Sequence, residues 1–110
     1  MTSRGSRRDG ADAATAFMAS LDARDASPHT KRAYRTALAQ YLDWLEGVPG
    51  VDWTRPPRRT LRAYLAELNG RDLSRSTISS RVAALRSFYR FCRRQGWVEG
   101  DPWAAVVTPR

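Results

Sequence analysis

The sequence contains very few of the residues from which most enzyme sites are built. Its 110 residues include a single cysteine, Cys92, and a single histidine, His29. These numbers exclude a disulfide within the chain and a zinc site of the usual cysteine and histidine type. The carboxylates are scattered without an evident pair, and there is no glycine-rich phosphate loop. We therefore expect no catalytic residue, no metal and no cofactor in this chain.

Long apolar runs and segments of alternating hydrophobicity are also missing. No stretch is apolar enough to span a bilayer and no signal peptide is recognisable, so we expect a cytoplasmic protein without membrane contact. Without alternation, no sheet is predicted. Hydrophobic residues nevertheless make up 42 % of the sequence, which is enough for one modest core in one domain.

Basic residues are abundant. Eighteen arginines and one lysine stand against eleven acidic residues, which gives a formal net charge of +8. On so small a chain this surplus favours an anionic partner, with nucleic acid ahead of an acidic membrane surface. The planar guanidinium of arginine suits phosphates and guanine edges.

The apolar residues recur at the three- and four-residue spacing of helices. This spacing, together with capping residues such as Ser74 and stops such as Gly47 and Gly96, predicts four helices. Their approximate ranges are 9–24, 28–46, 57–69 and 74–95, followed by a short helical turn over 103–107 that Asp101 and Pro102 begin. We expect a compact all-α domain in which the tyrosines pack in the core.

The fourth predicted helix has two contrasting faces. One face is apolar, and the opposite face carries the small side chains Ser76, Ser80, Ala83 and Ser87 between arginines. A helix that enters a DNA groove needs small and basic side chains together. A solvated face, or helix packing through serine and alanine, remains open as an explanation of this pattern.

Two predicted helix starts combine hydroxyl groups with cations. These are residues 27–32, which read Ser-Pro-His-Thr-Lys-Arg, and residues 74–77, which read Ser-Arg-Ser-Thr. A helix N-terminus attracts anions through its free N–H groups and its dipole. The two starts would suit phosphates on either side of a groove, although ordinary capping with solvated cations also explains each one.

Several segments resemble the N-terminal core-binding domain of tyrosine recombinases of the Xer and phage-integrase kind. The similar segments, in order, are Ser27-Pro28-His29-Thr30 with Tyr34, then Leu73 to Ile78 with Arg81, then Ala84 to Tyr89, and finally Gly96 with Asp101-Pro102. The resemblance covers about residues 12–110, with Asp101 in place of the family's usual asparagine.

The resemblance implies a SAM-like helical domain that forms one half of a clamp around duplex DNA. The polar, basic composition of residues 1–10 predicts a disordered tail, and the resemblance places the core-binding domain at 11–107 and the start of an interdomain linker at 108–110. Strand exchange in DNA recombination and integration, by a nucleophilic tyrosine, would belong to a catalytic domain of a longer parent. The implied partners are double-stranded DNA, that catalytic domain and other recombinase subunits, and we expect the isolated domain to be monomeric.

The resemblance also implies which residues face DNA. By position, they are Thr30, Lys31, Arg35, Arg75, Ser76, Thr77, Ser80, Arg81 and Arg86. Two alternatives are a protein-interaction module, whose small-residue face docks a partner helix, and a stand-alone helical DNA-binding regulator.

Overall fold

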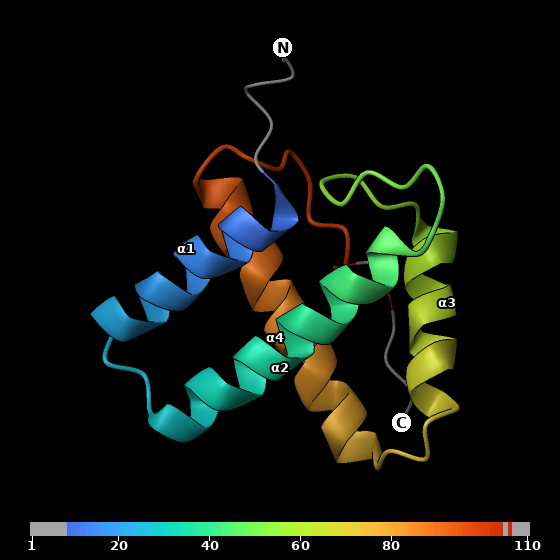
Figure 1. Ribbon diagram of the computed structural model, residues 1–110, viewed down its shortest axis with the longest axis horizontal. Helices are drawn as coiled ribbons and strands as arrows, with labels where there is room; N and C mark the ends of the chain where they lie inside the picture. The colour runs from blue at the N-terminus through green and yellow to red at the C-terminus, as the bar shows by residue number, and fades with distance from the viewer. Residues whose placement is uncertain (1–8, 105, 107–110) are drawn as a thin grey trace.

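Four helices form the part of the chain that the structure describes, as predicted. The computed structural model describes residues 9–104 and Val106, and no strand occurs among them. The helices are α1 (Gly10–Ala23), α2 (Pro28–Glu46), α3 (Arg58–Asn69) and α4 (Arg75–Arg94). Figure 1 shows α1 and α2 as a helical hairpin in front of α4, with α3 on the side away from the hairpin turn. The predicted all-α class is confirmed.

Local capping chemistry places the helix ends. Asp9, Ser27 and Ser74 each accept a backbone hydrogen bond at the start of α1, α2 and α4. At the end of α4, Gly96 has a φ of 84°, and the N–H of Trp97 donates to the carbonyl of Cys92 at 3.0 Å. This left-handed glycine ends the helix with a Schellman-type bond.

The apolar faces meet in a core rich in aromatic side chains. Tyr41, Tyr64, Tyr89 and Trp103 are fully buried, so the prediction that tyrosines pack in the core holds for these three tyrosines. The hydroxyl groups of Tyr41 and Tyr89 lie 2.8 Å apart, and Tyr89 donates to the carbonyl of Trp53 at 2.7 Å. These bonds tie the loop between α2 and α3 to α4 and satisfy buried polar groups.

Both ends of the chain depart from the predicted ranges or lie outside the described residues. Asp9 caps α1 and Gly10 is its first residue, which agrees with the predicted helix range 9–24 and shortens the predicted tail of 1–10. The rest of that tail and the predicted linker at 108–110 are outside the described residues. After α4, one turn at 102–104 buries Trp103, while residues 105 and 107 of the predicted turn are not described.

Candidate nucleic-acid interface

The starts of α2 and α4 share one capping arrangement. The Ser27 hydroxyl accepts from the Thr30 N–H at 3.1 Å and donates to the Thr30 hydroxyl at 3.0 Å. In the same way, the Ser74 hydroxyl accepts from the Thr77 N–H at 3.1 Å and donates to the Thr77 hydroxyl at 2.9 Å. The repeat fixes the first turn of each helix with a threonine hydroxyl at the same place, next to the positive end of the helix dipole.

The N-terminal halves of α2 and α4 border a groove of about 610 Å³, which we call the basic groove. The side chains along it are small, hydroxyl-bearing, aromatic or basic, and none is a carboxylate. They are His29, Thr30, Arg32, Ala33, Tyr34, Thr36, Ser76, Thr77, Ser80, Arg81 and Ala83. Because Ser76, Ser80 and Ala83 are exposed, the small-residue face of α4 is open rather than buried in a helix contact.

A polar bridge holds Arg81 at the edge of the basic groove. Its guanidinium donates to the side-chain oxygen of Gln40 on α2, and that oxygen also accepts from Arg71 at 3.1 Å. Arg71 in turn pairs with Glu67 at 3.1 Å. Because Gln40 is neutral, its contact with Arg81 orients the guanidinium without cancelling its charge.

Five of the nine predicted DNA-facing residues line the basic groove. These are Thr30, Ser76, Thr77, Ser80 and Arg81. Arg75, a sixth predicted residue, is the first residue of α4. Its side chain is exposed next to the groove but does not line the groove.

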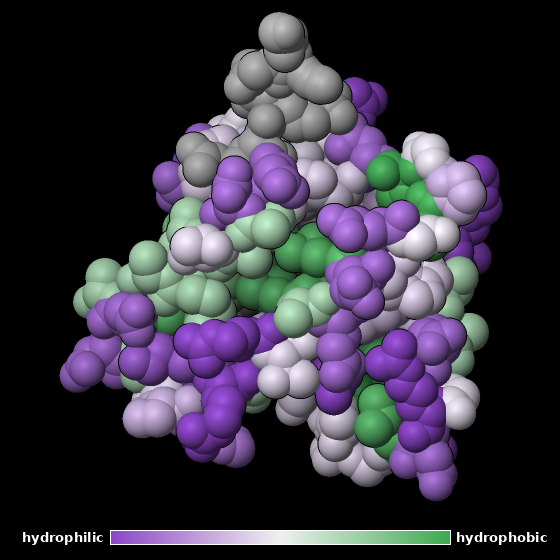
Figure 2. Space-filling view, in the orientation of Figure 1, coloured by the Kyte–Doolittle hydropathy of each residue, from purple (hydrophilic) through white to green (hydrophobic). Residues whose placement is uncertain are grey.

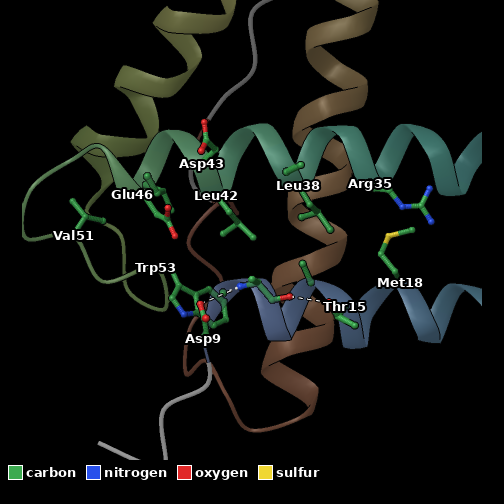
Figure 3. Close-up of a pocket in the computed structure, with 15 residues that line it drawn as sticks. Asp9, Thr15, Met18, Arg35, Leu38, Leu42, Asp43, Glu46, Val51 and Trp53 are labelled. Carbon is green, nitrogen blue, oxygen red and sulfur yellow. Dashed lines mark hydrogen bonds between the residues drawn. The ribbon is translucent and has the colours of Figure 1, made fainter.

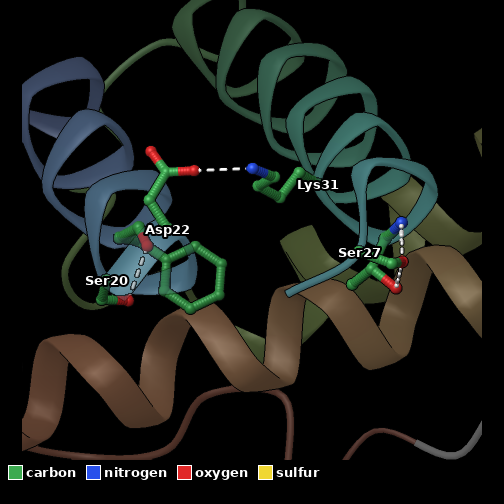
Figure 4. A network of polar contacts seen from close by, with 6 residues as sticks. Ser20, Asp22, Ser27 and Lys31 are labelled. Atoms are coloured by element: carbon green, nitrogen blue, oxygen red, sulfur yellow. Dashed lines mark hydrogen bonds and ion pairs between the residues drawn. The ribbon is translucent and has the colours of Figure 1, made fainter. Parts of the chain in front are cut away.

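The other three predicted residues point elsewhere. Lys31 pairs with Asp22 of α1 at 2.8 Å, a contact that joins the two arms of the hairpin (Figure 4). Arg35 lies beside Met18, on the α1 side of α2 (Figure 3). Arg86 donates to the carbonyls of Trp103 at 3.3 Å and Val106 at 2.7 Å, which anchors the segment after α4.

Three residues that line the basic groove are not among the nine predicted DNA-facing residues: His29, Arg32 and Thr36. They stand at positions i, i+3 and i+7 of α2, so they share one face of the helix. That spacing is visible in the sequence. His29 and Arg32 belong to the helix start at 27–32, whose hydroxyl groups and cations already suit an anion, whereas Thr36 lies one turn further along α2.

A second groove, of about 680 Å³, runs between α1 and α2, and we call it the apolar groove. Its floor includes Met18, Leu38, Leu42, Val51 and Trp53, as Figure 3 shows. In Figure 2 hydrophobic surface appears between the two helices with hydrophilic side chains around it. Three carboxylates and one guanidinium line its rim, in contrast with the basic groove: Asp9, Asp43, Glu46 and Arg35.

The described residues hold no group of three or more histidine, cysteine or acidic side chains that could bind a metal ion. Within the same part of the chain, no helix is long and apolar enough to cross a membrane.

The comparisons with known proteins agree on one family. Residues 14–96 match the family described as phage integrase, N-terminal SAM-like domain. A tyrosine recombinase XerC of Oceanobacillus iheyensis is 36 % identical over 89 residues, 79 % of this chain and 28 % of that protein. For a XerC of Roseiflexus castenholzii the identity is 35 % over 96 residues, 86 % of this chain and 31 % of the relative.

A third relative, a tyrosine recombinase XerC of Lactobacillus delbrueckii subsp. bulgaricus, is 42 % identical over 90 residues, 79 % of this chain and 30 % of that protein. The chain therefore spans less than a third of the length of these relatives. No solved structure was found to match it. Since the family match covers most of the chain and the four helices agree with a SAM-like fold, the chain belongs to the phage-integrase N-terminal SAM-like domain family.

Proposed function

We propose that this chain is the duplex-DNA-binding domain of a site-specific tyrosine recombinase and that it holds DNA in the basic groove. One observation carries the proposal: a groove lined by hydroxyl groups and cations, with no carboxylate, on a chain of net charge +8. DNA carries a dense row of phosphates, so a groove of this kind attracts it without a repulsive group to overcome.

The groove offers two kinds of contact. The free N–H groups at the starts of α2 and α4, with Arg32 and Arg81, would bind phosphates and position the duplex. The small side chains of Ser76 and Ser80 let α4 approach base edges, where hydroxyl groups can donate or accept. Arg75, exposed at the mouth of the groove, would add a phosphate contact.

The relatives extend the proposal to a larger protein. Because they are named tyrosine recombinases and are more than three times as long as the matched region, we place catalysis in a part of the parent that this chain does not match. This domain would then clamp DNA near the recombination site, in the cytoplasm, together with the catalytic domain and other recombinase subunits.

A salt titration tests the proposal. Fluorescence anisotropy with a labelled duplex should give an affinity whose logarithm falls linearly with the logarithm of salt concentration. If about five phosphates are neutralised, the slope should be roughly −4 to −5. Absence of salt-dependent binding at low ionic strength would overturn the proposal.

The protein-interaction alternative gives two different expectations. Ser76→Arg would fill the small-residue face and abolish contact with a partner helix, while duplex affinity would be absent from the start. Salt-dependent duplex binding by the unchanged protein therefore supports the proposal against this alternative. Loss of a partner complex in a chain that never binds DNA would support the alternative.

A further inference from the structure

A second cationic cluster lies outside the basic groove. Arg24, at the end of α1, and Arg90 and Arg94, on the last turns of α4, surround a depression of about 230 Å³. No carboxylate lines this depression, and all three arginines are exposed. Among the described residues none of the three forms an ion pair. Three like charges are thus gathered without a counter-charge.

The surroundings of this cluster supply polar groups for an anion. The hydroxyl of Ser87 accepts from Arg90 at 3.3 Å, and Gln95 also lines the depression, whereas the Ser20 hydroxyl there donates to the Phe17 carbonyl at 2.6 Å. The carboxylates nearest along the chain are absent from the lining, and Asp22 is already paired with Lys31. A bound phosphate oxygen would therefore meet guanidinium, hydroxyl and amide donors together.

The cluster continues the exposed face of α4 that begins in the basic groove. The residues of this stripe recur at three- and four-residue steps: Ser76, Ser80, Ala83, Ser87, Arg90 and Arg94. All are exposed except Ser87, which is half-buried, so nothing in the described fold covers the stripe. From the middle of Ser76 and Ser80 to the middle of Arg90 and Arg94 the helix rises about 21 Å.

The distance of about 21 Å along α4 can be compared with the width of the DNA major groove. The major groove of B-DNA is about 12 Å wide between its two backbones. The distance of about 21 Å between the two anion-binding ends of α4 exceeds this width. A helix that lies across the groove can therefore reach a phosphate of each strand. We infer that Arg24, Arg90 and Arg94 form a second phosphate site, which binds the DNA strand across the major groove from the one held by the basic groove.

Favourable interaction with the helix dipole explains only part of the cluster. Arginines in the last turn of a helix are stabilised by the partial negative charge there, and this accounts for Arg93 and Arg94. It does not account for Arg24, which comes from another helix, or for Arg90, one turn earlier. The convergence of two helices on one depression is what distinguishes a binding site from helix-end stabilisation.

The inference rests on the proposed function, and a matched pair of variants tests it. The test variant is Arg90→Gln with Arg94→Gln, and the control is Arg58→Gln with Arg62→Gln on α3. Each pair consists of exposed arginines four residues apart on one helix, and each variant removes two positive charges. Neither control residue lines any of the three depressions described above.

The salt slope of duplex binding is the readout. Loss of one phosphate contact should make the slope shallower by about 0.9 in the test variant, while the control keeps the slope of the unchanged protein. Equal melting temperatures of the three proteins would show that folding is intact.

The failures of the two proposals are distinguishable. If the unchanged protein binds DNA with the expected slope but the test variant matches it, or shifts no more than the control, the second phosphate site is wrong and the basic groove stands. If the unchanged protein shows no salt-dependent binding, the proposed function is wrong and this site falls with it.

Discussion

Helix α2 separates two grooves of similar size and opposite chemistry. Its first half borders the basic groove of about 610 Å³, and its second half, with α1, borders the apolar groove of about 680 Å³. The basic groove contains no carboxylate, whereas three carboxylates lie around the apolar one. The two grooves therefore differ in the charge and size of their lining side chains rather than in volume.

The difference also shows how one helix serves two purposes. Arg32 and Arg35 are three residues apart on α2, yet Arg32 lines the basic groove and Arg35 the apolar one. The surroundings of each arginine depend on the helix opposite α2. Beside Arg32, α4 contributes Ser76 and Ser80 to the groove lining, whereas beside Arg35, α1 contributes Met18. A net charge of +8 alone would not have distinguished the two grooves.

The largest expected effect comes from the hydrophobic core. Leu85 is fully buried on α4, so Leu85→Ala should destabilise the fold by about 2–5 kcal/mol through lost burial and a cavity. Urea unfolding measures it. A cost below about 1 kcal/mol would mean that α4 does not depend on this contact for its position.

Charge reversal should separate the two grooves. Arg32→Glu with Arg81→Glu places two carboxylates in the basic groove and should lower duplex affinity by about 100-fold or more, since two phosphate contacts become repulsive. Binding is measured by anisotropy at one fixed salt concentration. The control is Arg58→Glu with Arg62→Glu on α3, which changes the net charge equally. Equal losses in both variants would mean that overall charge, not the groove, drives binding.

Alkaline pH should weaken the core through its buried tyrosines. Burial raises the pKa of Tyr41, Tyr64 and Tyr89 above the ordinary tyrosine value. Above pH 10 the unfolded chain loses phenolic protons that the folded protein keeps, so stability falls as pH rises, by up to about 1.4 kcal/mol per pH unit for each tyrosine.

Urea unfolding between pH 8 and 11 checks this dependence. Stability should be insensitive to these tyrosines below about pH 9 and decline above about pH 10. Tyr64→Phe should make the decline shallower, because one of the three titrating groups is removed. A flat profile up to pH 11 would contradict the burial of these hydroxyl groups.

The smallest effect is expected in the apolar groove. Asp43→Asn with Glu46→Gln removes two negative charges, yet duplex affinity should change by less than about threefold at physiological salt, because exposed charges act only over about 8 Å there. Anisotropy measures it beside the charge-reversal pair. A gain of tenfold or more would mean that DNA also approaches this side of α2.

The helices could be predicted from the sequence because local chemistry sets their ends. Ser27, Ser74 and Gly96 each act within one turn of their own position, so the observed bounds lie within a few residues of the predicted ones. The SAM-like family resemblance is confirmed by the match over residues 14–96. It could be recognised from the sequence because its motifs are mostly these local signals.

The groove could be predicted only in part because it depends on packing between distant segments. Arg86 looked available on α4, but the segment after α4 returns and brings two carbonyls to its guanidinium. Lys31 looked free at a helix start until α1 placed Asp22 beside it. Neither contact has a short-range sequence signal, so the DNA-facing role of the nine residues stays a prediction.

An NMR titration of the protein with a short duplex tests the central claim most directly. At low salt, the backbone amide shifts should move along residues 29–36 of α2 and 76–83 of α4, and stay unchanged along the α1 side of the apolar groove. Shifts concentrated at residues 10–18 and 38–53 instead would place DNA on the apolar groove and contradict the account.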